Sequence, residues 1–302
     1  MARSTAGLIV IIAATLFTTV AFAAQRSYDR RLSAPPGGRL TFYTDVGSVT
    51  VVGHHAPEVI IHAELRGSES FLARFHISAE QTPSGVTIAA HGAQGGWHHW
   101  FDFGSNQVRF AVEVPRDYPV DLQTSGGDVD VRNLNASVRA TTSGGNGSVQ
   151  NVVGTVTVHT SGGNIEADHI KGAAELSTSG GNIHVTDSTG DLDLRTAGGD
   201  LRMQNDDGRV HAVTLGGNIQ ARLRANRGIS FSTDGGDITL LLPQNTRASI
   251  EAKTSGGRIT CDFPLSTMRI SAGDHVLGAL GGGGSPISLH ASGGSIHIAP
   301  EQ

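Results

Sequence analysis

The first candidate for chemistry in this chain is a glycine pair that recurs. Residues 178–185 read TSGGNIHV, and a Gly-Gly followed by a polar residue could form a loop whose backbone amides bind phosphate. Such a loop needs a helix N-terminus after the glycines and usually a lysine. Here an apolar-x-apolar segment follows, which is typical of a strand. The pattern therefore favours a structural turn over a phosphate site.

Calcium is the second candidate ligand of these turns. Calcium-binding nonapeptide repeats also form coils of two short strands, with the pattern G-G-x-G-x-D-x-U-x. In this sequence Ile183 stands where the fourth-position glycine would be, and the aspartate of the pattern is missing. We therefore expect no regular calcium sites, and we predict no metal or other cofactor.

One stretch outside the repeat is rich in aromatic rings. Residues 95–104 read GGWHHWFDFG. Its rings could stack on sugars or dock on a partner surface, or the loop could fold back over the chain's own core. Zinc is disfavoured because adjacent histidines on a strand face opposite ways and no third ligand is evident. The candidate partner-contact residues are Trp97, His98, His99, Trp100, Phe101 and Phe103.

The glycine pair belongs to a repeat that fills the second half of the chain. Nine copies of the type TSGG(N/D) begin at residues 124, 142, 160, 178, 196, 214, 233, 254 and 291. At half the 18-residue spacing, a second apolar-x-apolar segment follows another glycine, as at Gly154, Gly172 and Gly190. Each unit therefore holds two short strands. A helix is excluded, because each glycine in a helix interior costs about 1 kcal/mol.

Such strand pairs can bury an apolar face only when they stack. The sequence therefore predicts an all-β, parallel β-solenoid of 18-residue, two-strand coils, stacked about 4.8 Å apart. The outward positions vary in charge and type, which indicates solvated faces. The residues expected to point inward around the 178–203 coils are Ile183, Val185, Leu192, Leu194, Leu201 and Met203.

Two polar columns repeat with the coils. We expect the Asn/Asp column to favour left-handed turns and to hydrogen-bond to the copies above and below. The threonine that begins each copy could form a hydroxyl ladder. The predicted structural turn ladder consists of Asp128, Asn146, Asn164, Asn182, Asp200, Asn218 and Asp237.

The start of the chain predicts a targeting signal, with a lone membrane anchor as the less favoured alternative because the apolar stretch is short for a bilayer span. Arg3, the uncharged residues 7–22 and the sequence Ala21-Phe22-Ala23 fit a secretory signal peptide over residues 1–23. We therefore expect export to the periplasm, the cell surface or the extracellular space, with no integral membrane span once the signal is removed.

Aromatic residues divide the rest of the chain. Residues 24–123 are rich in them and read as a β-rich N-terminal cap, whereas residues 124–302 read as the solenoid. A cap shields the open edge of the first coil, and an unshielded end permits end-to-end self-association. Near the other end, the 18-residue repeat is interrupted by residues 262–286, which include the four glycines Gly281–Gly284. Residues 287–298 then read as a last coil.

Charge and cysteine content exclude several classes. The formal net charge is −5, so the chain lacks the excess of positive charge that binding to nucleic acid requires. Cys261 is the single cysteine, so no intramolecular disulfide can form. We recognise no nucleophile–base arrangement and predict a protein that is not an enzyme. The less favoured alternative is a carbohydrate-active hydrolase or lyase, whose β-helix coils and loops are longer.

The repeated T-S-G-G-[ND]-[IV]-x-[VA] motif, with DVGSVTV upstream and a leader peptide, resembles the bacterial candidate-adhesin β-strand-repeat family, which is related to GIN-type adhesin heads. Gly181-Asn182-Ile183 and Gly163-Asn164-Ile165 carry this resemblance. It implies an exported right-handed β-solenoid acting as an adhesin or envelope binding module. A surface protein or glycan is the expected partner, and a purely structural envelope scaffold is the alternative. The resemblance carries no catalytic residues.

Overall fold

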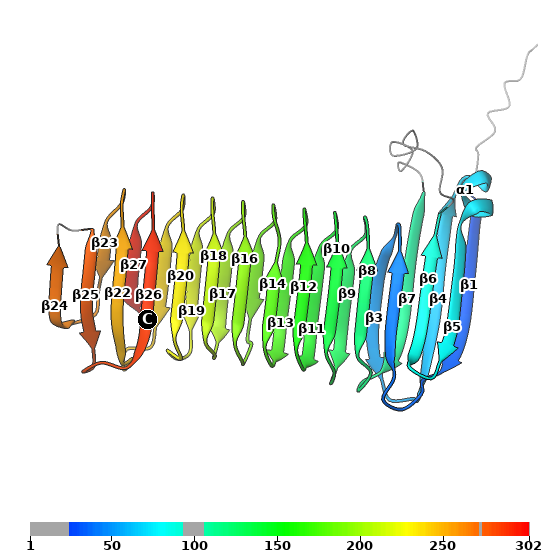
Figure 1. The fold of residues 1–302 in the computed structure, drawn as a ribbon, viewed down its shortest axis with the longest axis horizontal. Helices are drawn as coiled ribbons and strands as arrows, with labels where there is room; N and C mark the ends of the chain where they lie inside the picture. Colours follow the sequence, from blue (N-terminus) through cyan, green and yellow to red (C-terminus); the bar gives the residue numbers. More distant parts are fainter. Residues whose placement is uncertain (1–23, 93–105, 272–273, 302) are drawn as a thin grey trace, which may run out of the picture.

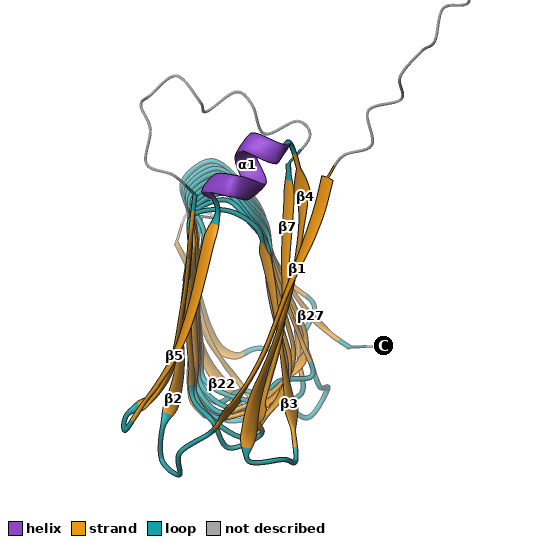
Figure 2. Cartoon of the chain, turned by 90° about the vertical axis from the view of Figure 1, so that its right-hand side faces the viewer, coloured by secondary structure: helices purple, strands orange, loops and turns teal. Residues whose placement is uncertain are grey.

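The computed structural model describes residues 24–92, 106–271 and 274–301. Nearly all of these residues lie in two long β-sheets that face each other along a rod (Figures 1 and 2). The only helix of the described residues is α1 (Glu69–Arg74). No helix in the described part of the chain has the length and apolar character needed to cross a membrane.

The strands of the two sheets, in spatial order, are as follows. The first sheet contains β1 (Ala24–Ser33), β4 (Glu58–Gly67), β7 (Gln107–Pro115), β3 (Ser48–His54), β9 (Val129–Leu134), β11 (Gly147–Val153), β13 (Ile165–Lys171), β15 (Ile183–Thr186), β17 (Leu201–Asp206), β19 (Ile219–Leu223), β21 (Ile238–Leu242), β27 (Ile296–Pro300) and β23 (Ile259–Cys261). The second sheet contains β24 (Ser266–Ser271), β25 (His275–Leu280), β22 (Ala248–Thr254), β26 (Ser285–Ala291), β20 (Ile229–Thr233), β18 (Val210–Thr214), β16 (Leu192–Thr196), β14 (Ala174–Ser177), β12 (Val156–Thr160), β10 (Val138–Thr142), β8 (Val120–Thr124), β2 (Arg39–Thr44), β6 (Gly85–His91) and β5 (His76–Thr82).

The coils stack in register at the spacing that the repeat predicts. Val138 pairs with Val156 in the second sheet, and Ile165 pairs with Ile183 in the first, in both cases through parallel strands. Each coil therefore uses one strand of each sheet and climbs by one strand. The parallel β-solenoid is confirmed.

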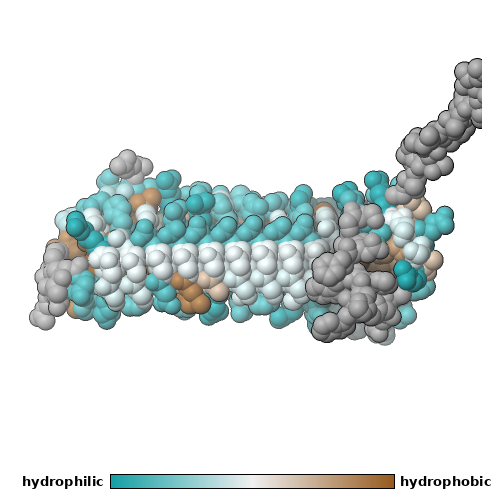
Figure 3. Space-filling view, turned by 90° about the horizontal axis from the view of Figure 1, so that it is seen from above, coloured by the Kyte–Doolittle hydropathy of each residue, from teal (hydrophilic) through white to brown (hydrophobic). Residues whose placement is uncertain are grey.

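The Ser-Gly-Gly corners join the second sheet to the first. In most corners the serine and the first glycine are exposed and the second glycine is buried; at the C-terminal end Ser292 is partly buried and Gly257 is exposed. The exposed residues form a flat strip, which we call the Ser-Gly strip, along the rod (Figure 3). The strip is closely packed, since the N–H of Gly180 donates to the carbonyl of Ser161 at 3.1 Å and that of Gly198 to Ser179 at 3.0 Å.

The threonine column at these corners joins hydroxyl groups to the backbone. The buried hydroxyl of Thr178 donates to the carbonyl of Gly163 in the preceding coil at 2.8 Å. It also accepts the N–H of Gly181 at 3.2 Å. The same pair of bonds recurs at Thr142, Thr160, Thr196 and Thr214. The expected hydroxyl-to-hydroxyl ladder is therefore wrong, because the nearer backbone groups satisfy each hydroxyl.

The Asn/Asp column also bonds to the backbone of the next coil. The Oδ1 atom of Asn164 accepts the N–H of Asn182 at 2.8 Å, and that of Asn182 accepts the N–H of Asp200 at 2.8 Å. Equivalent bonds run from Asp128 through Asp237 to Ser295. These side-chain oxygens thus satisfy corner N–H groups that the strand ladders leave unpaired.

Left-handed backbone occurs at the opposite corner instead. The non-glycine residues with positive φ among the described residues are Asn133, Asn151, His169, Asp187 and Asn205, with φ between 52° and 61°. They recur every 18 residues, each five positions after a member of the Asn/Asp column. Asn and Asp favour this conformation, so the spacing was a usable signal. Left-handed residues are therefore present, as expected, but they lie at the corner opposite the Asn/Asp column and not in that column.

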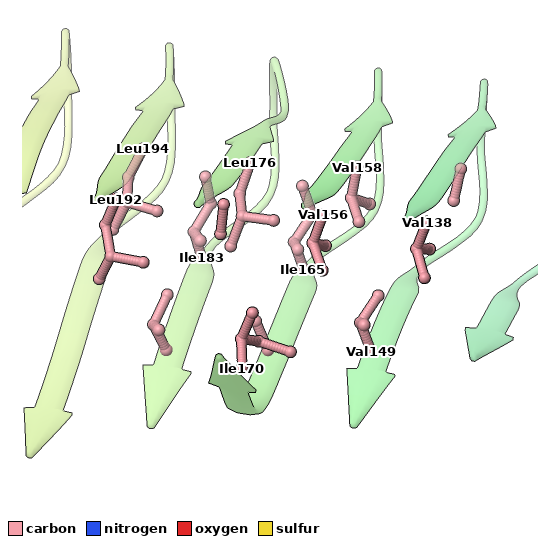
Figure 4. Packing of buried hydrophobic residues seen from close by; sticks show 14 of the residues in the cluster. Val138, Val149, Val156, Val158, Ile165, Ile170, Leu176, Ile183, Leu192 and Leu194 are labelled. Carbon is pink, nitrogen blue, oxygen red and sulfur yellow. The ribbon is translucent and has the colours of Figure 1, made fainter. Parts of the chain in front are cut away.

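The core lies between the two sheets (Figure 4). All six residues predicted to point inward from the 178–203 coils are buried. Val, Ile and Leu side chains dominate the coils shown, and each contributes about 1.5–3 kcal/mol when fully buried. The apolar-x-apolar pattern therefore fixes which face of each strand is inside.

Both sheets continue across residue 123 into the N-terminal region. β2 and β3 form a coil that pairs with β8 and β9, with Thr44 opposite Thr124 and Val49 opposite Val129. Beyond it, β6 and β7 form another parallel coil. The antiparallel strands β1, β4 and β5 then end the two sheets. Residues 47–51 are thus part of a full coil.

At the other end, the coil that is last in sequence is not last in space. β26 lies between β20 and β22, and β27 lies between β21 and β23. The hairpin of β24 and β25 then covers β22. Residues 287–298 do form a coil, as expected, but it is inserted between two coils that are neighbours in sequence.

A valine at position 178 tests the threonine bonds. Thr178→Val keeps the shape of the side chain but leaves the carbonyl of Gly163 and the N–H of Gly181 buried without a partner. We expect a loss of about 2 kcal/mol in the free energy of unfolding, measured by urea denaturation. Thr157→Val, on the outer face of β12, is the matched control and should change stability by less than about 0.5 kcal/mol. Equal losses in both variants would contradict the role of the buried hydroxyl.

Candidate functional site

The largest hollow that we describe lies at the N-terminal end of the Ser-Gly strip. It has a volume of about 1050 Å³. We call it the N-terminal groove, and it is lined by Asp45, Val46, Gly47, Ser48, Phe71, Asn106, Gln107, Val108, Arg109, Ser125, Gly126, Gly127, Ser143 and Gly144. Three corners of neighbouring coils, the start of β7 and one side chain of α1 therefore meet there.

The floor of the groove is the corner between β2 and β3. The hydroxyl of Thr44 donates to the carbonyl of Val46 at 2.6 Å, and the N–H of Asp45 donates to Ala90 at 3.3 Å. Gly47 has a φ of 105°, and a Cβ there would meet Val108 at 2.8 Å. Val46 occupies the position that Gly126 has in the next coil. This corner therefore carries an apolar side chain at a position where the Ser-Gly strip otherwise has glycine.

Helix α1 forms one wall. Ser68 is its N-cap and accepts the N–H of Phe71 at 3.2 Å. At the other end of the helix, Arg26 of β1 donates to the carbonyls of Leu72 at 2.8 Å and Phe75 at 2.6 Å. A cation satisfies the free carbonyls of a helix C-terminus and suits its dipole. These contacts hold the helix across the end of the two sheets (Figure 2), with Phe71 at the groove.

The lining suits recognition of a partner with both apolar and polar groups. Val46, Phe71 and Val108 supply apolar surface, and Asp45 and Arg109 supply opposite charges. Glycine corners leave backbone groups accessible beside them. A concave, largely apolar site with a few polar groups is the usual form of a binding site. The volume also exceeds that of the second hollow described below.

That second hollow lies on the outer face of the first sheet and holds about 290 Å³. Both of its charged side chains already have partners. Arg202 donates to the side-chain oxygen of Gln220 at 3.2 Å, and Arg222 lies 3.6 Å from the carboxylate of Glu301. Because these contacts occupy its charged groups and its volume is small, we do not assign a ligand to it.

Among the described residues, one group of three could offer ligands to a metal ion. It consists of Asp168, His169 and Asp187. His169 Nδ1 lies 2.8 Å from Asp168 Oδ1, and the guanidinium of Arg224 donates to Asp187 Oδ1 at 3.0 Å. The arginine thus supplies the positive charge that a metal would bring, and the group fits an ion-pair cluster better than a metal site.

A buried carboxyl lies close to that cluster. Asp206 is 1% exposed, and its Oδ1 accepts the N–H of Ser188 at 2.8 Å. Its Oδ2 is buried and has no hydrogen-bond partner among the described residues. Burial raises the pKa of Asp206 to about 7, against the opposing effect of the Ser188 N–H. The side chain lies in the core column beside Leu223, so we interpret it as a structural feature rather than a binding group.

The residues predicted from the sequence lie in different places. The aromatic residues Trp97 to Phe103 fall outside the described residues. The segment lies between β6 and β7 in the chain, at the place where other coils have a Ser-Gly-Gly corner. Gly92 and Asn106 are the described residues on either side of it. The Asn/Asp column runs along the rod as hydrogen-bond acceptors. The sequence did not reveal the groove, although Asp45 to Ser48 of its lining belong to the DVGSVTV motif.

The fold and the corners define a class, the two-sheet parallel β-solenoid with glycine corners. The chain belongs to the Toastrack DUF4097 family, whose profile matches residues 39–299. This assignment confirms the family resemblance that the repeats indicate. No curated relative matches the chain.

Solved structures that resemble this chain include three described as a candidate cell adhesion protein or candidate adhesins. One from Clostridium sporogenes is 12% identical, with 91% of this chain and 100% of that chain covered and a TM-score of 0.22. One from Bacteroides fragilis is 11% identical, with 91% and 97% covered and a TM-score of 0.37. One from Parabacteroides merdae is 8% identical, with 92% and 97% covered and a TM-score of 0.29.

Proposed function

We propose that this protein is an exported, non-enzymatic binding module of the adhesin type, which contacts a surface protein or glycan. The N-terminal groove carries the proposal, because it is the larger of the two hollows described above and combines apolar and charged groups. At the remaining corners, backbone hydrogen bonds hold successive coils close together. The flat surface that results offers a ligand little contact area. The adhesin description of the structural neighbours is consistent with this function.

A binding screen tests the proposal directly. The purified protein is applied to a glycan array and used to recover partners from cell-envelope fractions. We expect one class of surface molecule to be retained. Fractionation of the producing cells should place the protein outside the cytoplasm. Recovery of no glycan, lipid or protein partner, or a cytoplasmic location, would contradict the proposed function.

Groove variants test the location of binding. Val46→Ser and Arg109→Ser change side chains at the groove, and we expect the double variant to lose at least tenfold in affinity for the recovered partner, or about 1.4 kcal/mol. Its melting temperature should stay within a few degrees of the parent protein. Leu215→Ser is the matched control, since Leu215 is 55% exposed on the Ser-Gly strip away from the groove. Equal affinity of the double variant and the control would place binding elsewhere.

The aromatic segment is tested in the same assay. Trp97→Ala and Trp100→Ala in one chain should weaken partner binding with unchanged melting if the rings contact the partner. Loss of folding in that variant supports the alternative, in which the rings cover the protein's own core. The comparison with the Val46 and Arg109 variant shows whether the segment and the groove act on one partner.

A further inference from the structure

Strand pairing holds the inserted C-terminal coil on both sides. Ile287 of β26 pairs with Ile229 of β20 on one side and with Ile250 of β22 on the other. In the first sheet, Ile296 of β27 pairs with both Ile238 and Ile259. The coil thus fills a slot between two coils that are neighbours in sequence. Its core side chains Ile287, Leu289, Ile296 and Ile298 are all buried there.

The coil lacks one of the contacts that anchor its neighbours. Ala291 stands in the threonine column, paired with Thr233 below and Thr254 above. Thr254 donates to the carbonyl of Gly294 at 2.7 Å, so the coil above is attached to the inserted coil. Alanine has no hydroxyl to donate to the coil below. The inserted coil is therefore attached to the coil of β20 and β21 without a threonine hydroxyl, by the backbone ladders, by packing and by corner bonds such as that from the N–H of Ser295 to Asp237 at 2.7 Å.

The segment that leads into the coil is a glycine hinge. Gly281, Gly282 and Gly283 have φ values of 55°, 84° and 93°, which glycine adopts without strain. Gly284 lies against the backbone of Arg247, and the coil begins at the next residue. Four glycines in a row allow many backbone directions. The hinge can therefore direct the coil into its own slot or away from it.

The walls of the slot are joined by a connection long enough to keep the slot open. Residues 243–247 connect β21 to β22 across two strand spacings. Residues 224–228, the same number, connect β19 to β20 across one. A fully extended residue spans about 3.3 Å and a strand spacing is about 4.8 Å, so the longer step needs no strain. The slot can thus receive the coil from its own chain or from another.

We propose that residues 285–301 form an exchangeable coil and that the slot they fill accepts the same coil of a second copy of this chain. A second copy is the partner that fits, because its coil reproduces every pairing and every buried side chain of the closed chain. Exchange changes only the path of the glycine hinge. A hinge of this kind is the usual route to domain-swapped dimers. The proposal is independent of the partner that the N-terminal groove binds.

Paired cysteine variants detect the exchange. Two full-length chains, both with Cys261→Ser, carry either Ser230→Cys or Ser288→Cys, which are register partners on β20 and β26 and are not fully buried. The two chains are unfolded, mixed, refolded together at high protein concentration and oxidised. A disulfide between the two versions can form at this register only when the coil of one chain lies in the slot of the other. We expect a disulfide-linked heterodimer, with twice the monomer mass by light scattering.

Two controls keep the result interpretable. The mismatched pair Ser230→Cys and His290→Cys lies two residues out of register and should give several-fold less heterodimer. A chain carrying both Ser230→Cys and Ser288→Cys, oxidised at low concentration, should form an internal disulfide, which shows that the geometry permits the bond. If that internal disulfide forms while the matched and mismatched pairs give equal heterodimer, the exchange proposal is overturned.

Discussion

At pH 8, an Asp206→Asn variant should be more stable than the parent protein by up to about 4 kcal/mol, measured by urea unfolding. At pH 4 the two proteins should unfold alike. The cause is the position of the carboxyl, which is 1% exposed and has one oxygen without a partner among the described residues. Burial raises its pKa to about 7 from 3.8. At 1.36 kcal/mol for each pKa unit, ionising this group costs the folded state about 4 kcal/mol.

The pH dependence follows from the same values. Because the folded pKa lies above the unfolded one, the protonated carboxyl contributes stability that is fully present below about pH 3.8. This contribution is lost as the pH rises from about 3.8 to about 7. Asparagine stays neutral throughout, and its oxygen can still accept the N–H of Ser188. The variant should therefore lack this part of the pH profile.

Asp207→Asn is the neighbouring control with the opposite sign. Asp207 lies 2.9 Å from the guanidinium of Arg227, whose hydrogen bond lowers the pKa of the carboxyl. Its contribution is present above the unfolded pKa and is lost as the pH falls through the folded pKa. The pair is largely exposed, so Asp207→Asn should lose less than about 1 kcal/mol at pH 8. The Asp207→Asn variant measures the part of the pH dependence that comes from Asp207. If the parent protein is equally stable at pH 4 and pH 8 once that part is subtracted, the burial of Asp206 does not destabilise the folded state at pH 8.

The second large effect is expected at Gly181, in the TSGGNIHV corner. Gly181→Ala should destabilise the protein by about 3 kcal/mol or more. A Cβ on Gly181 would overlap the carbonyl oxygen of Gly163 in the preceding coil. The oxygen belongs to the backbone and the Cβ is bonded directly to it, so neither can move without separating the coils. Thermal and urea unfolding, followed by circular dichroism, measure the loss.

Gly180→Ala is the matched control, one residue earlier in the same corner. Its Cβ would lie 3.8 Å from the carbonyl of Gly162, which is an ordinary van der Waals contact. The Ser-Gly strip leaves this position exposed, and we expect a change of less than about 0.5 kcal/mol. Similar losses in the two variants would mean that backbone flexibility, and not the close approach of the coils, requires the glycine pair.

Much of the candidate site could not be predicted from the sequence. The DVGSVTV motif indicated a coil, but the groove above it also needs Phe71 of α1 and the start of β7. Arg26 and Leu72 lie far apart in the chain and meet only because β1 ends the first sheet beside the helix. The burial of Asp206 was equally hidden, since Leu134, Val152 and Ile170 in its column are apolar and the neighbouring Asp207 is part of a surface ion pair.

The sequence by itself determined the coil. The 18-residue period predicted the register of Val138 with Val156, and the apolar-x-apolar pattern predicted that Ile183 and Leu201 are buried. These features follow from local rules that every coil repeats. The tertiary structure alone decided the order of the coils at both ends, where β2–β3 and β26–β27 are inserted between coils that are neighbours in sequence. Equivalent coils offer nearly identical edges, so their order depends on which edges remain unpaired and on how far the connections reach.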